Sequence, residues 1–480
     1  MKNKTDRQAV LARFEKISRI PRCSGHEEKI GEFLRDWAAA RGFPARMDRV
    51  GNLLVMVPAS PGRENGPVLV LQSHQDMVCE KNPASRHDFS RDPLRLRHDG
   101  DWLRAEGTTL GADNGIGIAI AMALAEDREL AHPKLELLFT VDEESGLTGA
   151  AHLEPDFFSG RVLLNLDSED EGVFTIGCAG GRDCELLLDL AHAAWPAGHR
   201  GYELSVAGLQ GGHSGVDIHE QRGNANVLLA RTLAELRRIG IFHPVDLHGG
   251  SAHNAIPREA SARLALPASE APRFVASLEE WAASVRRDFP HEPHLAITLE
   301  GRDEAARIIS PETAGRILDL LLVAPDGVMA MSREVDGLVE TSVNFATIRQ
   351  RDGQLSLLFS LRSDKPGGIA WQAARLEGLA RLTGGRFNSG SGYPGWQPDP
   401  DSPLLARAQQ VYRQLFGREA AIEIIHAGLE CGVIGARKPG LEMLSLGPTV
   451  KNPHSPEERL FLPSLDRFCL FIRELLASFR

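Results

Sequence analysis

Cysteine is scarce in this sequence, with six in 480 residues, and no two of them form a CxxC pair. Such sparse and unpaired cysteines argue against a disulfide framework and against a zinc site built from thiolates. An apolar signal segment is also lacking, because the start of the chain is charged throughout. No run approaches the ~18 uninterrupted apolar residues that a membrane-spanning helix needs. We therefore expect no membrane partner and a cytoplasmic location.

Positive charge is outweighed, with 54 lysines and arginines against 65 aspartates and glutamates and a formal net charge of −11. Because a nucleic-acid partner normally needs a basic surface, this balance argues against one. The sequence has no GxSxG elbow and no Walker loop. The glycine-rich stretch at 115–120 lacks the third glycine of a GxGxxG motif and the strand before it, so a nicotinamide enzyme is disfavoured.

Both ends of the chain carry short, continuous apolar runs, which are typical of strands buried on both faces of a sheet. These runs span residues 52–57, 68–72, 135–141, 162–166 and 441–446. Helix-like segments such as 116–127 and 404–416 alternate with them, and this alternation favours a wound α/β domain. A chain of this length also exceeds what one hydrophobic core usually supports, so we expect two domains.

The middle of the chain has a different pattern of strand, helix, strand, strand, helix and strand, followed by a similar series. Residues 254–266 resemble residues 344–362, which indicates an internal repeat. We therefore predict an α/β catalytic domain interrupted by an α+β lid domain that holds two tandem βαββαβ units. The boundaries that we expect are 1–183 and 388–480 for the catalytic domain and 184–387 for the lid.

Candidate metal ligands lie just beyond the carboxyl ends of the expected strands. In open α/β sheets, the loops that follow these ends converge and hold the ligand. A single histidine or loop carboxylate is more often an ordinary polar residue, but the coincidence of several at strand ends makes that explanation poor. The candidates are His74, Glu143, Glu144, Asp167 and His454, together with Asp113 at the expected start of a helix.

The residue types of this set indicate its metal chemistry. Imidazole and carboxylate ligands without thiolate suit zinc, manganese or cobalt, and zinc is favoured on affinity. With one of Glu143 and Glu144 counted, two histidines and three carboxylates are too many for one tetrahedral ion, but they fit two ions that share a bridging carboxylate. In the pair Glu143 and Glu144, one carboxylate can bind a metal while its neighbour takes a proton from the bridging water. We therefore predict two Zn²⁺ per chain, which Co²⁺ or Mn²⁺ can replace.

Seven motifs extend this prediction to a family. They are SHQDMV, GADNGIGIA, DEESGLTGA, NLDSED, GGHSGVDI, HAGLECG and PTVKNPHSPEE, in this order along the chain. The series resembles that of aminoacyl-histidine dipeptidases, the Xaa-His peptidases of the bacterial carnosinase type, within the superfamily of di-zinc exopeptidases and deacylases. The resemblance implies a zinc-exopeptidase-like fold and a metallo-dipeptidase that cleaves Xaa-His and related small peptides. A di-zinc N-acyl-amino-acid deacylase and a broad-specificity aminopeptidase are the alternatives.

The same resemblance assigns the metal ligands by position. It implies that Asp113 bridges both ions. His74 and Asp167 would complete one zinc site. Glu144 and His454 would complete the other.

Neighbouring residues of these motifs are implied in catalysis. Glu143 would be the general base, and its presence disfavours a non-catalytic metal- or peptide-binding protein on the same scaffold. Asp76 would hold the imidazole of His74 in one tautomer. His213, in the lid, would donate a hydrogen bond to the oxyanion. The resemblance also implies a cis peptide bond between residues 113 and 114.

Four further residues are implied in substrate binding. Asn254 and Arg362 resemble lid residues that hold the substrate, while His426 and Glu430 resemble residues that line the site. We expect Arg362 to bind the free terminal carboxylate of a dipeptide, because a guanidinium fork matches that group. In many relatives a dimer partner supplies the lid histidine, and the long, doubled lid leaves both a monomer and a homodimer open.

Overall fold

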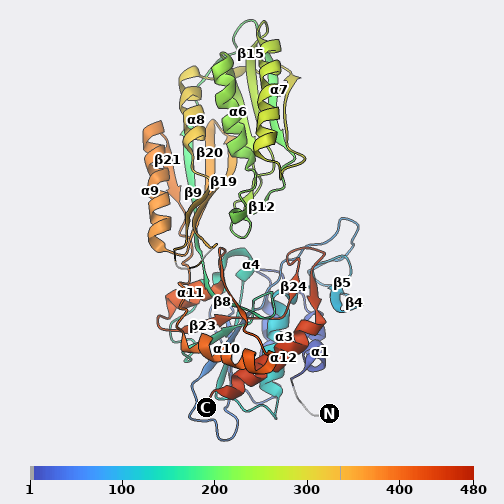
Figure 1. Cartoon of the computed structure of the whole chain (residues 1–480). Helices are drawn as coiled ribbons and strands as arrows, with labels where there is room; N and C mark the ends of the chain where they lie inside the picture. The colour runs from blue at the N-terminus through green and yellow to red at the C-terminus, as the bar shows by residue number, and fades with distance from the viewer. Residues whose placement is uncertain (1–4, 334, 336) are drawn as a thin grey trace. The chain divides into compact units, whose positions relative to one another are not determined.

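The computed structural model describes residues 5–333, 335 and 337–480, and the chain divides into two compact units (Figure 1). The first unit consists of Met1–Cys178, Trp396–Ile424 and Leu429–Arg480, and the second of Ala179–Gly395 and Ile425–Gly428. The boundaries expected after residues 183 and 387 lie a few residues inside the second unit as the structure divides it. The short segment Ile425–Gly428 was not expected there.

In the described part of the first unit, an eight-stranded sheet has the order β1-β2-β6-β3-β7-β23-β8-β22. Its four central strands, β6, β3, β7 and β23, run parallel to one another. Every residue of β3, β6 and β7 is buried, because these leucine- and valine-rich strands are covered on both faces. The strands are β1 (Ala45–Met47), β2 (Leu53–Val57), β3 (Leu69–His74), β6 (Leu135–Thr140), β7 (Val162–Asn165), β8 (Val173–Cys178), β22 (Ala421–Ile425) and β23 (Glu442–Ser445).

Helix α3 (Ala112–Glu126) is central to the packing of this unit. Every residue from Asn114 to Ala125 is buried, and the helix contacts β3, β6 and α1, as expected of a helix that is apolar all round. The other helices are α1 (Arg7–Ile17), α2 (Glu28–Ala40), α4 (Glu143–Gly146), α5 (Thr148–His152), α10 (Pro403–Phe416), α11 (Glu430–Arg437) and α12 (Leu462–Ser478). A smaller sheet has the order β24-β25-β5-β4, formed by Val450–Lys451, Arg459–Phe461, Trp102–Ala105 and Leu96–Asp99.

Among the described residues, the second unit forms a nine-stranded sheet with the order β16-β11-β15-β13-β19-β20-β9-β21, and β18 pairs with β19. Two βαββαβ units make up this sheet, β11-α6-β13-β15-α7-β16 and β9-α8-β19-β20-α9-β21. They join edge to edge where β13 pairs with β19. Two such units were predicted, but the tandem order was wrong. The βαββαβ unit that starts with β11 is inserted in the one that starts with β9, between β9 and α8. β9 belongs with the later strands because it pairs along its whole length with the distant strand β20.

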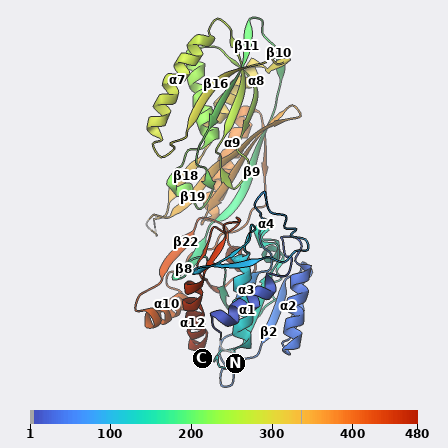
Figure 2. The ribbon, with the colours of Figure 1, turned by 90° about the vertical axis from the view of Figure 1, so that its right-hand side faces the viewer.

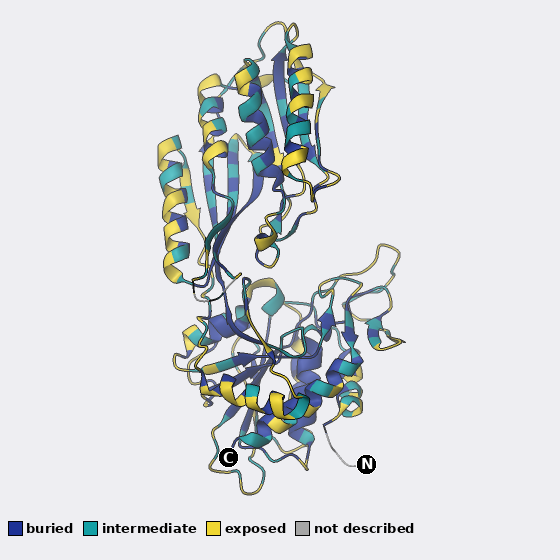
Figure 3. Cartoon of the chain, in the orientation of Figure 1, coloured by how far each residue is buried: buried dark blue, intermediate teal, exposed yellow. Residues whose placement is uncertain are grey.

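The helices of this second unit form one layer against its sheet. They contact one another in the row α7-α6-α8-α9, and Figures 1 and 2 show this row beside the strands. In Figure 3 the strands are mostly buried, while the outward faces of the helices are exposed. The elements are β9 (Gly180–Asp189), β10 (His192–Ala194), β11 (His199–Ala207), β12 (Gly212–His213), η1 (Ile218–Glu220), α6 (Ala225–Ile239), β13 (His243–Gly249), β14 (Ala255–Ile256), β15 (Ala260–Pro267), α7 (Ala271–Asp288), β16 (Ala296–Arg302), β17 (Arg307–Ile309), α8 (Pro311–Val323), β18 (Gly327–Met331), β19 (Val339–Arg351), β20 (Gln354–Ser363), α9 (Pro366–Thr383) and β21 (Arg386–Ser389).

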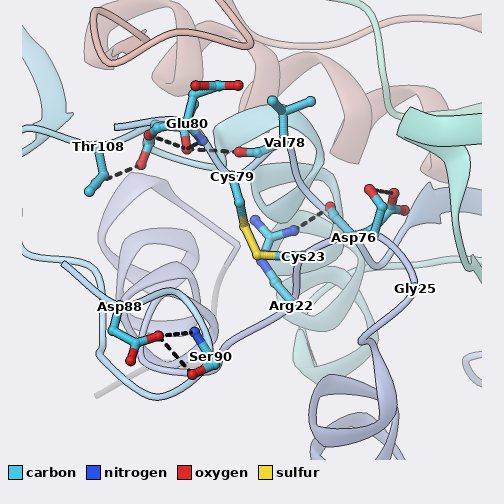
Figure 4. Close-up of a disulfide and its surroundings, with 12 residues drawn as sticks. Arg22, Cys23, Gly25, Asp76, Val78, Cys79, Glu80, Asp88, Ser90 and Thr108 are labelled. Carbon is cyan, nitrogen blue, oxygen red and sulfur yellow. Dashed lines mark hydrogen bonds between the residues drawn. A yellow bond between two sulfur atoms is a disulfide. The ribbon is translucent and has the colours of Figure 1, made fainter. Parts of the chain in front are cut away.

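A disulfide joins Cys23, in the break between α1 and α2, to Cys79, in the loop after β3 (Figure 4). The sequence pattern did not indicate this pair, because the two cysteines are 56 residues apart. One bond does not make a disulfide framework, and the remaining four cysteines are buried thiols. Among the described residues, no helix combines the length and the apolar character that crossing a membrane requires.

Candidate metal centre and substrate-binding residues

The candidate ligands lie beyond the carboxyl ends of the parallel strands in the first unit. His74 is the last residue of β3, and Glu144 lies in α4, which follows β6. Asp167 is the second residue after β7, and His454 lies in the loop after β24. Asp113 is the second residue of α3. Because loops at this edge of a parallel sheet converge, side chains far apart in the sequence meet there.

Asp113 joins two histidine–carboxylate pairs. Its Oδ1 lies 2.9 Å from Nε2 of His74, and this nitrogen lies 3.4 Å from Oδ1 of Asp167. Its Oδ2 lies 3.1 Å from Nε2 of His454, and this second nitrogen lies 2.9 Å from Oε2 of Glu144. The five side chains therefore form two groups that share Asp113, with one carboxylate oxygen facing each group.

The backbone at Asp113 has an unusual geometry. The peptide bond between Asp113 and Asn114 is cis, which confirms what the family resemblance implied. Both residues have non-helical torsion angles, although they lie at the start of α3. The side-chain amide of Asn114 donates to the carbonyl of Leu166 at 2.9 Å and to Oδ1 of Asp167. Asn114 therefore connects the segments that carry two of the candidate ligands.

Asp76 holds His74 and the turn that follows β6. Its Oδ1 lies 3.3 Å from Nδ1 of His74, so the other ring nitrogen, Nε2, faces the cluster. The carboxylate also accepts hydrogen bonds from the backbone N–H groups of Glu143 and Glu144, both at 3.1 Å. A fourth partner is the hydroxyl of Ser24 at 2.7 Å. One buried carboxylate thus fixes the relative positions of an imidazole and the adjacent pair of glutamates.

Negative charge exceeds positive charge in this cluster. Burial alone would lower the pKa of His74, but Asp167 and Asp113 raise that pKa well above its usual value. Hydrogen bonds to Asp113 and Glu144 raise the pKa of His454 to about 11. Burial alone would raise the pKa of Asp113, but the two imidazoles hold it well below its usual range. A divalent cation would take the place of these protons and neutralise the same carboxylates.

Burial raises the pKa of both Glu143 and Glu144, and Glu144 also contacts His454. Burial raises the pKa of Glu143 well above its usual value, and the negative charges of Asp167 and Glu144 raise it further. A carboxyl group with a raised pKa is suited to accepting and returning a proton. Oε1 of Glu144 is buried and has no hydrogen-bond partner among the described residues, which fits a metal ligand. The nitrogen and oxygen donors of the cluster also fit zinc.

A second group of carboxylates, of Glu27, Asp76 and Asp142, also brings oxygen atoms within 4.8 Å of one another. This group has no histidine, and hydrogen-bond donors surround its oxygens. Glu27 accepts from the backbone N–H of Asp142 at 2.9 Å, and Asp142 accepts from the hydroxyls of Ser145 and Thr148. These donors fill the positions that a cation would need. The cluster around Asp113 is therefore the candidate metal centre.

His213 and Asn254 lie together in the second unit. His213 ends β12 and pairs with Ala255 of β14, which directly follows Asn254. The carbonyl of Asn254 accepts a hydrogen bond from the backbone N–H of Ser214 at 2.8 Å. The glycines at 211–212 have φ angles of 69° and 141°, which residues with a side chain rarely adopt. The GGHSG motif therefore has the glycines that this turn requires.

Arg362 and His426 approach the same turn. A Cβ atom at Gly215 would lie 2.2 Å from the carbonyl oxygen of His426 and 3.0 Å from Nε of Arg362, so only glycine fits there. Arg362 donates to the hydroxyl of Tyr393 at 2.8 Å, and Nε2 of His426 lies 2.8 Å from Oγ of Ser342. Burial and the charge of Arg362 lower the pKa of His426 to about 3, so its imidazole is neutral. Four of the predicted residues thus lie near one another in this unit.

Glu430 lies in the first unit and is fully buried. Its Oε2 accepts hydrogen bonds from the side-chain amide of Gln72 at 2.5 Å and from the hydroxyl of Thr140 at 2.8 Å. These partners belong to β3, which ends in His74, and to β6, which precedes α4. Glu430 therefore connects the ends of two ligand-bearing strands, and its place in the wall of a substrate site stays a prediction.

Two charged residues that sequence reasoning missed lie beside the candidate ligands. Arg22 donates to backbone carbonyls that include those of Gln75 and Asp76, and Glu458 accepts from the backbone N–H groups of residues 110–113. Only weak signals in the sequence pointed to these two residues. Arg22 lies in the PRCSG break between two helices, and Glu458 ends the motif that carries His454.

Comparison with known proteins adds a family context. The family model described as Peptidase family M20/M25/M40 matches residues 70–478. The cytosol non-specific dipeptidase of Escherichia coli (strain K12) is 40% identical over 466 residues, which cover 96% of this chain and 96% of that protein. The crystal structure of the aminoacylhistidine dipeptidase from Vibrio alginolyticus has a TM-score of 0.87 and 39% identity, and the match covers 98% of this chain and 96% of that chain. The aminopeptidase PepT from Bacillus cereus ATCC 10987 has a TM-score of 0.60 at 15% identity over 98% of each chain, which shows a common fold.

Proposed function

This chain belongs to peptidase family M20/M25/M40, and from that premise we propose that it is a dipeptidase that cleaves Xaa-His and related dipeptides with a pair of metal ions. Its relatives at 40% and 39% identity are dipeptidases. One is described as non-specific and the other by its action on aminoacylhistidine, so the proposed substrates include histidine dipeptides without being limited to them. The observation that carries the proposal is Asp113, whose two oxygens face two separate histidine–carboxylate pairs.

The proposed cofactors are two Zn²⁺ ions per chain, which Co²⁺ or Mn²⁺ can replace. Asp113 would be the shared ligand. His74 and Asp167 would complete one site, and Glu144 and His454 would complete the other. Nitrogen and oxygen donors without thiolate support this assignment, as does the unpaired oxygen of Glu144. Two such ions, when bound, supply charge that polarises the peptide carbonyl and activates water for attack.

Glu143 would be the general base of the reaction. It would take a proton from the attacking water and return it to the leaving amine. Its raised pKa, caused by burial, supports this task. Asp76 would keep the imidazole of His74 in place, as its contact with Nδ1 suggests. His213 would donate a hydrogen bond to the oxyanion that develops on the scissile carbonyl.

Arg362 would bind the free carboxylate at the end of a dipeptide. Its Nε is buried and has no hydrogen-bond partner among the described residues, so the guanidinium has donor capacity left for a ligand. Asn254 and His426, near the same turn, would hold the rest of the substrate together with Glu430. The need for a free carboxylate close to the scissile bond would then limit the substrate to short peptides.

We further propose a cytoplasmic enzyme with small peptides as its partners and no nucleic acid or membrane. A homodimer through the second unit is also proposed, because α9 exposes large apolar side chains there. Trp371 is 65% and Leu382 is 83% exposed. Light scattering after size-exclusion chromatography would test this assembly, and a monomer at micromolar concentration would contradict it.

An assay of the metal-loaded enzyme against matched substrates tests the activity. The panel pairs each free dipeptide, including Xaa-His, with the same peptide acetylated at its N-terminus, and adds N-acetyl amino acids and a tetrapeptide. We expect turnover of the free dipeptides only. Preferred turnover of N-acetyl amino acids would favour the deacylase, and removal of single residues from the tetrapeptide would favour a broad aminopeptidase.

A further inference from the structure

Arg22 binds two of the loops that carry candidate ligands. It is almost completely buried, and its Nη1 donates to the carbonyl of Gln75 at 3.0 Å and to that of Asp76 at 2.5 Å. Its Nη2 donates to the carbonyl of Gly111. Figure 4 shows the guanidinium directed toward Asp76. One side chain thus connects the loop after His74 with the loop that leads to Asp113.

Glu458 binds the backbone N–H groups of the loop that leads to Asp113. Its side chain is also almost completely buried. Oε2 accepts from Leu110 at 2.7 Å and from Gly111 at 2.9 Å, and Oε1 accepts from Ala112 at 2.7 Å and from Asp113 at 3.3 Å. A carboxylate at the start of a helix is also favoured by the helix dipole. Because Glu458 is four residues after His454, it connects a third ligand loop to the same segment.

Gly111 is held from both sides by these two charges. Its N–H binds Glu458 and its carbonyl binds Arg22. Its φ angle is +65°, and a Cβ atom would lie 2.6 Å from Nη2 of Arg22 and 2.7 Å from Sδ of Met77. The segment that ends in Asp113 therefore lies against a buried cation and a buried anion, with no space for a side chain between them.

The segment that carries Arg22 is itself fixed. The carbonyl of Arg22 accepts from the backbone N–H of Met77 at 3.1 Å, and the hydroxyl of Ser24 donates to Asp76 at 2.7 Å. Between them, Cys23 forms the disulfide with Cys79 (Figure 4). Residues 22–24 therefore form a rigid support for the loop after β3.

We propose that Arg22 and Glu458 are positioning residues of the metal centre, which hold the loops of His74, Asp113 and His454 at the spacing that two ions require. This inference rests on the proposed function, since it takes those three residues as ligands. Both charges act through backbone atoms and leave the ligand side chains free to bind metal. A bridging carboxylate must serve two ions ~3.5–4 Å apart, so a small displacement of its loop weakens both sites.

The variants for the test are Arg22→Met, Arg22→Lys and Glu458→Gln, and the chain offers a matched control for each charge. Arg349 of the second unit donates to the carbonyls of Gly249 and Gly250, both at 2.6 Å. Glu136, near the amino end of β6, is buried and accepts from the backbone N–H of Gly160 at 2.9 Å. Arg349→Met and Glu136→Gln therefore remove the same kind of interaction away from the ligand loops.

Each metal-free protein is titrated with Co²⁺, followed by the visible absorption of the bound ion, and its thermal unfolding is recorded separately. We expect Arg22→Met and Glu458→Gln to weaken Co²⁺ binding about 10- to 100-fold, as for other residues that orient metal ligands, and to alter the absorption spectrum. Arg22→Lys should recover part of the affinity, because it keeps the charge but loses the planar fork. The control variants should lose thermal stability and keep the wild-type affinity and spectrum.

Wild-type affinity and spectrum in Arg22→Met and Glu458→Gln would overturn this inference and leave the metal proposal standing. An equal loss of affinity in the controls would also overturn it. A wild-type protein that binds no Co²⁺ would overturn both proposals. If Arg22→Met does not fold, the test uses Arg22→Lys and Glu458→Gln. Amide hydrogen exchange of residues 110–113 is then measured in the metal-free proteins. The exchange should be faster in these two variants than in the wild type and should not change in the controls.

Discussion

Among single residues, Asp113 is the one on which both proposed metal positions depend. Because each of its carboxylate oxygens faces a different histidine, Asp113→Ala should lose both ions, whereas His74→Ala should mainly weaken one. Elemental analysis after dialysis checks this, with two ions per chain expected for the wild type. Glu154→Ala, at an exposed site of the same unit, is the control and should keep both. One tightly bound ion in Asp113→Ala would show that the carboxylate is not shared.

Glu143 offers a sharper test of the reaction. Glu143→Gln removes the proton acceptor and keeps the size of the side chain, so kcat should fall by ~10²–10⁴-fold. Metal content and the Co²⁺ spectrum should remain those of the wild type. Glu144→Gln is the contrasting variant, because it should lose metal together with activity. If Glu143→Gln retains more than about a tenth of the wild-type rate, another residue is the base.

The candidate ligands could be predicted from the sequence because their side chains follow recognisable apolar runs. His74 and Asp167 are both candidates because each follows such a run, and in the structure Nε2 of His74 lies 3.4 Å from Oδ1 of Asp167. Arg22 and Glu458 could not be predicted in the same way. Their partners are backbone groups, which any residue type can provide, so no pattern of side chains records the contact.

Among the elements, the strands that matched the prediction are those buried on both faces. The apolar runs at 135–141 and 162–166 became β6 and β7, because a parallel strand inside a sheet needs apolar side chains throughout. The strands of the small sheet were not predicted. β4 has the sequence LRHD and is largely exposed, so its composition resembles that of a loop. The hydrophobic pattern therefore identified the strands next to the candidate ligands and missed the strands at the surface.

The disulfide between Cys23 and Cys79 links the α1–α2 break to the loop after β3. In a chain-entropy model, a crosslink that closes a loop of this size stabilises a protein by ~4 kcal/mol. We therefore expect Cys23→Ser to lower the unfolding temperature under oxidising conditions. The matched measurement adds a reductant, which should lower the unfolding temperature of the wild type and leave that of Cys23→Ser unchanged. A wild type that is insensitive to reductant would contradict a stabilising role for this bond.

For the whole molecule, the order of strands in the second unit is what local patterns could not reveal. Gly180 of β9 pairs with Ser363 of β20, although the whole of the other βαββαβ unit lies between them in the sequence. A repeat detected by similarity alone is naturally taken as tandem, since nothing in the local sequence records an insertion. The two compact units of the chain also carry different parts of the proposed chemistry. The proposed metal ligands belong to the unit that contains the eight-stranded sheet, while His213, Asn254, Arg362 and His426 belong to the other unit.

This division makes a residue of the second unit the best test of the whole proposal. Arg362→Ala should lower kcat/KM on dipeptides about 10- to 100-fold, in line with a charged hydrogen bond worth ~1.5–3 kcal/mol. Metal content should not change, because every proposed ligand belongs to the first unit. Arg375→Ala, a change at another arginine of the second unit, is the control and should keep the wild-type kcat/KM.

Amidated substrates separate recognition of the carboxylate from a general loss of activity. The wild type should discriminate strongly against a dipeptide with an amidated C-terminus, because the amide leaves the buried guanidinium of Arg362 without its anion. In Arg362→Ala the same discrimination should shrink, since no cation remains to be left unpaired. We would measure kcat/KM for both substrates with both enzymes. The four values form a double-mutant cycle, whose interaction energy reports the contact between the substrate carboxylate and Arg362. Equal discrimination by the two enzymes would mean that the carboxylate is bound elsewhere, and Asn254 would be the next residue to change.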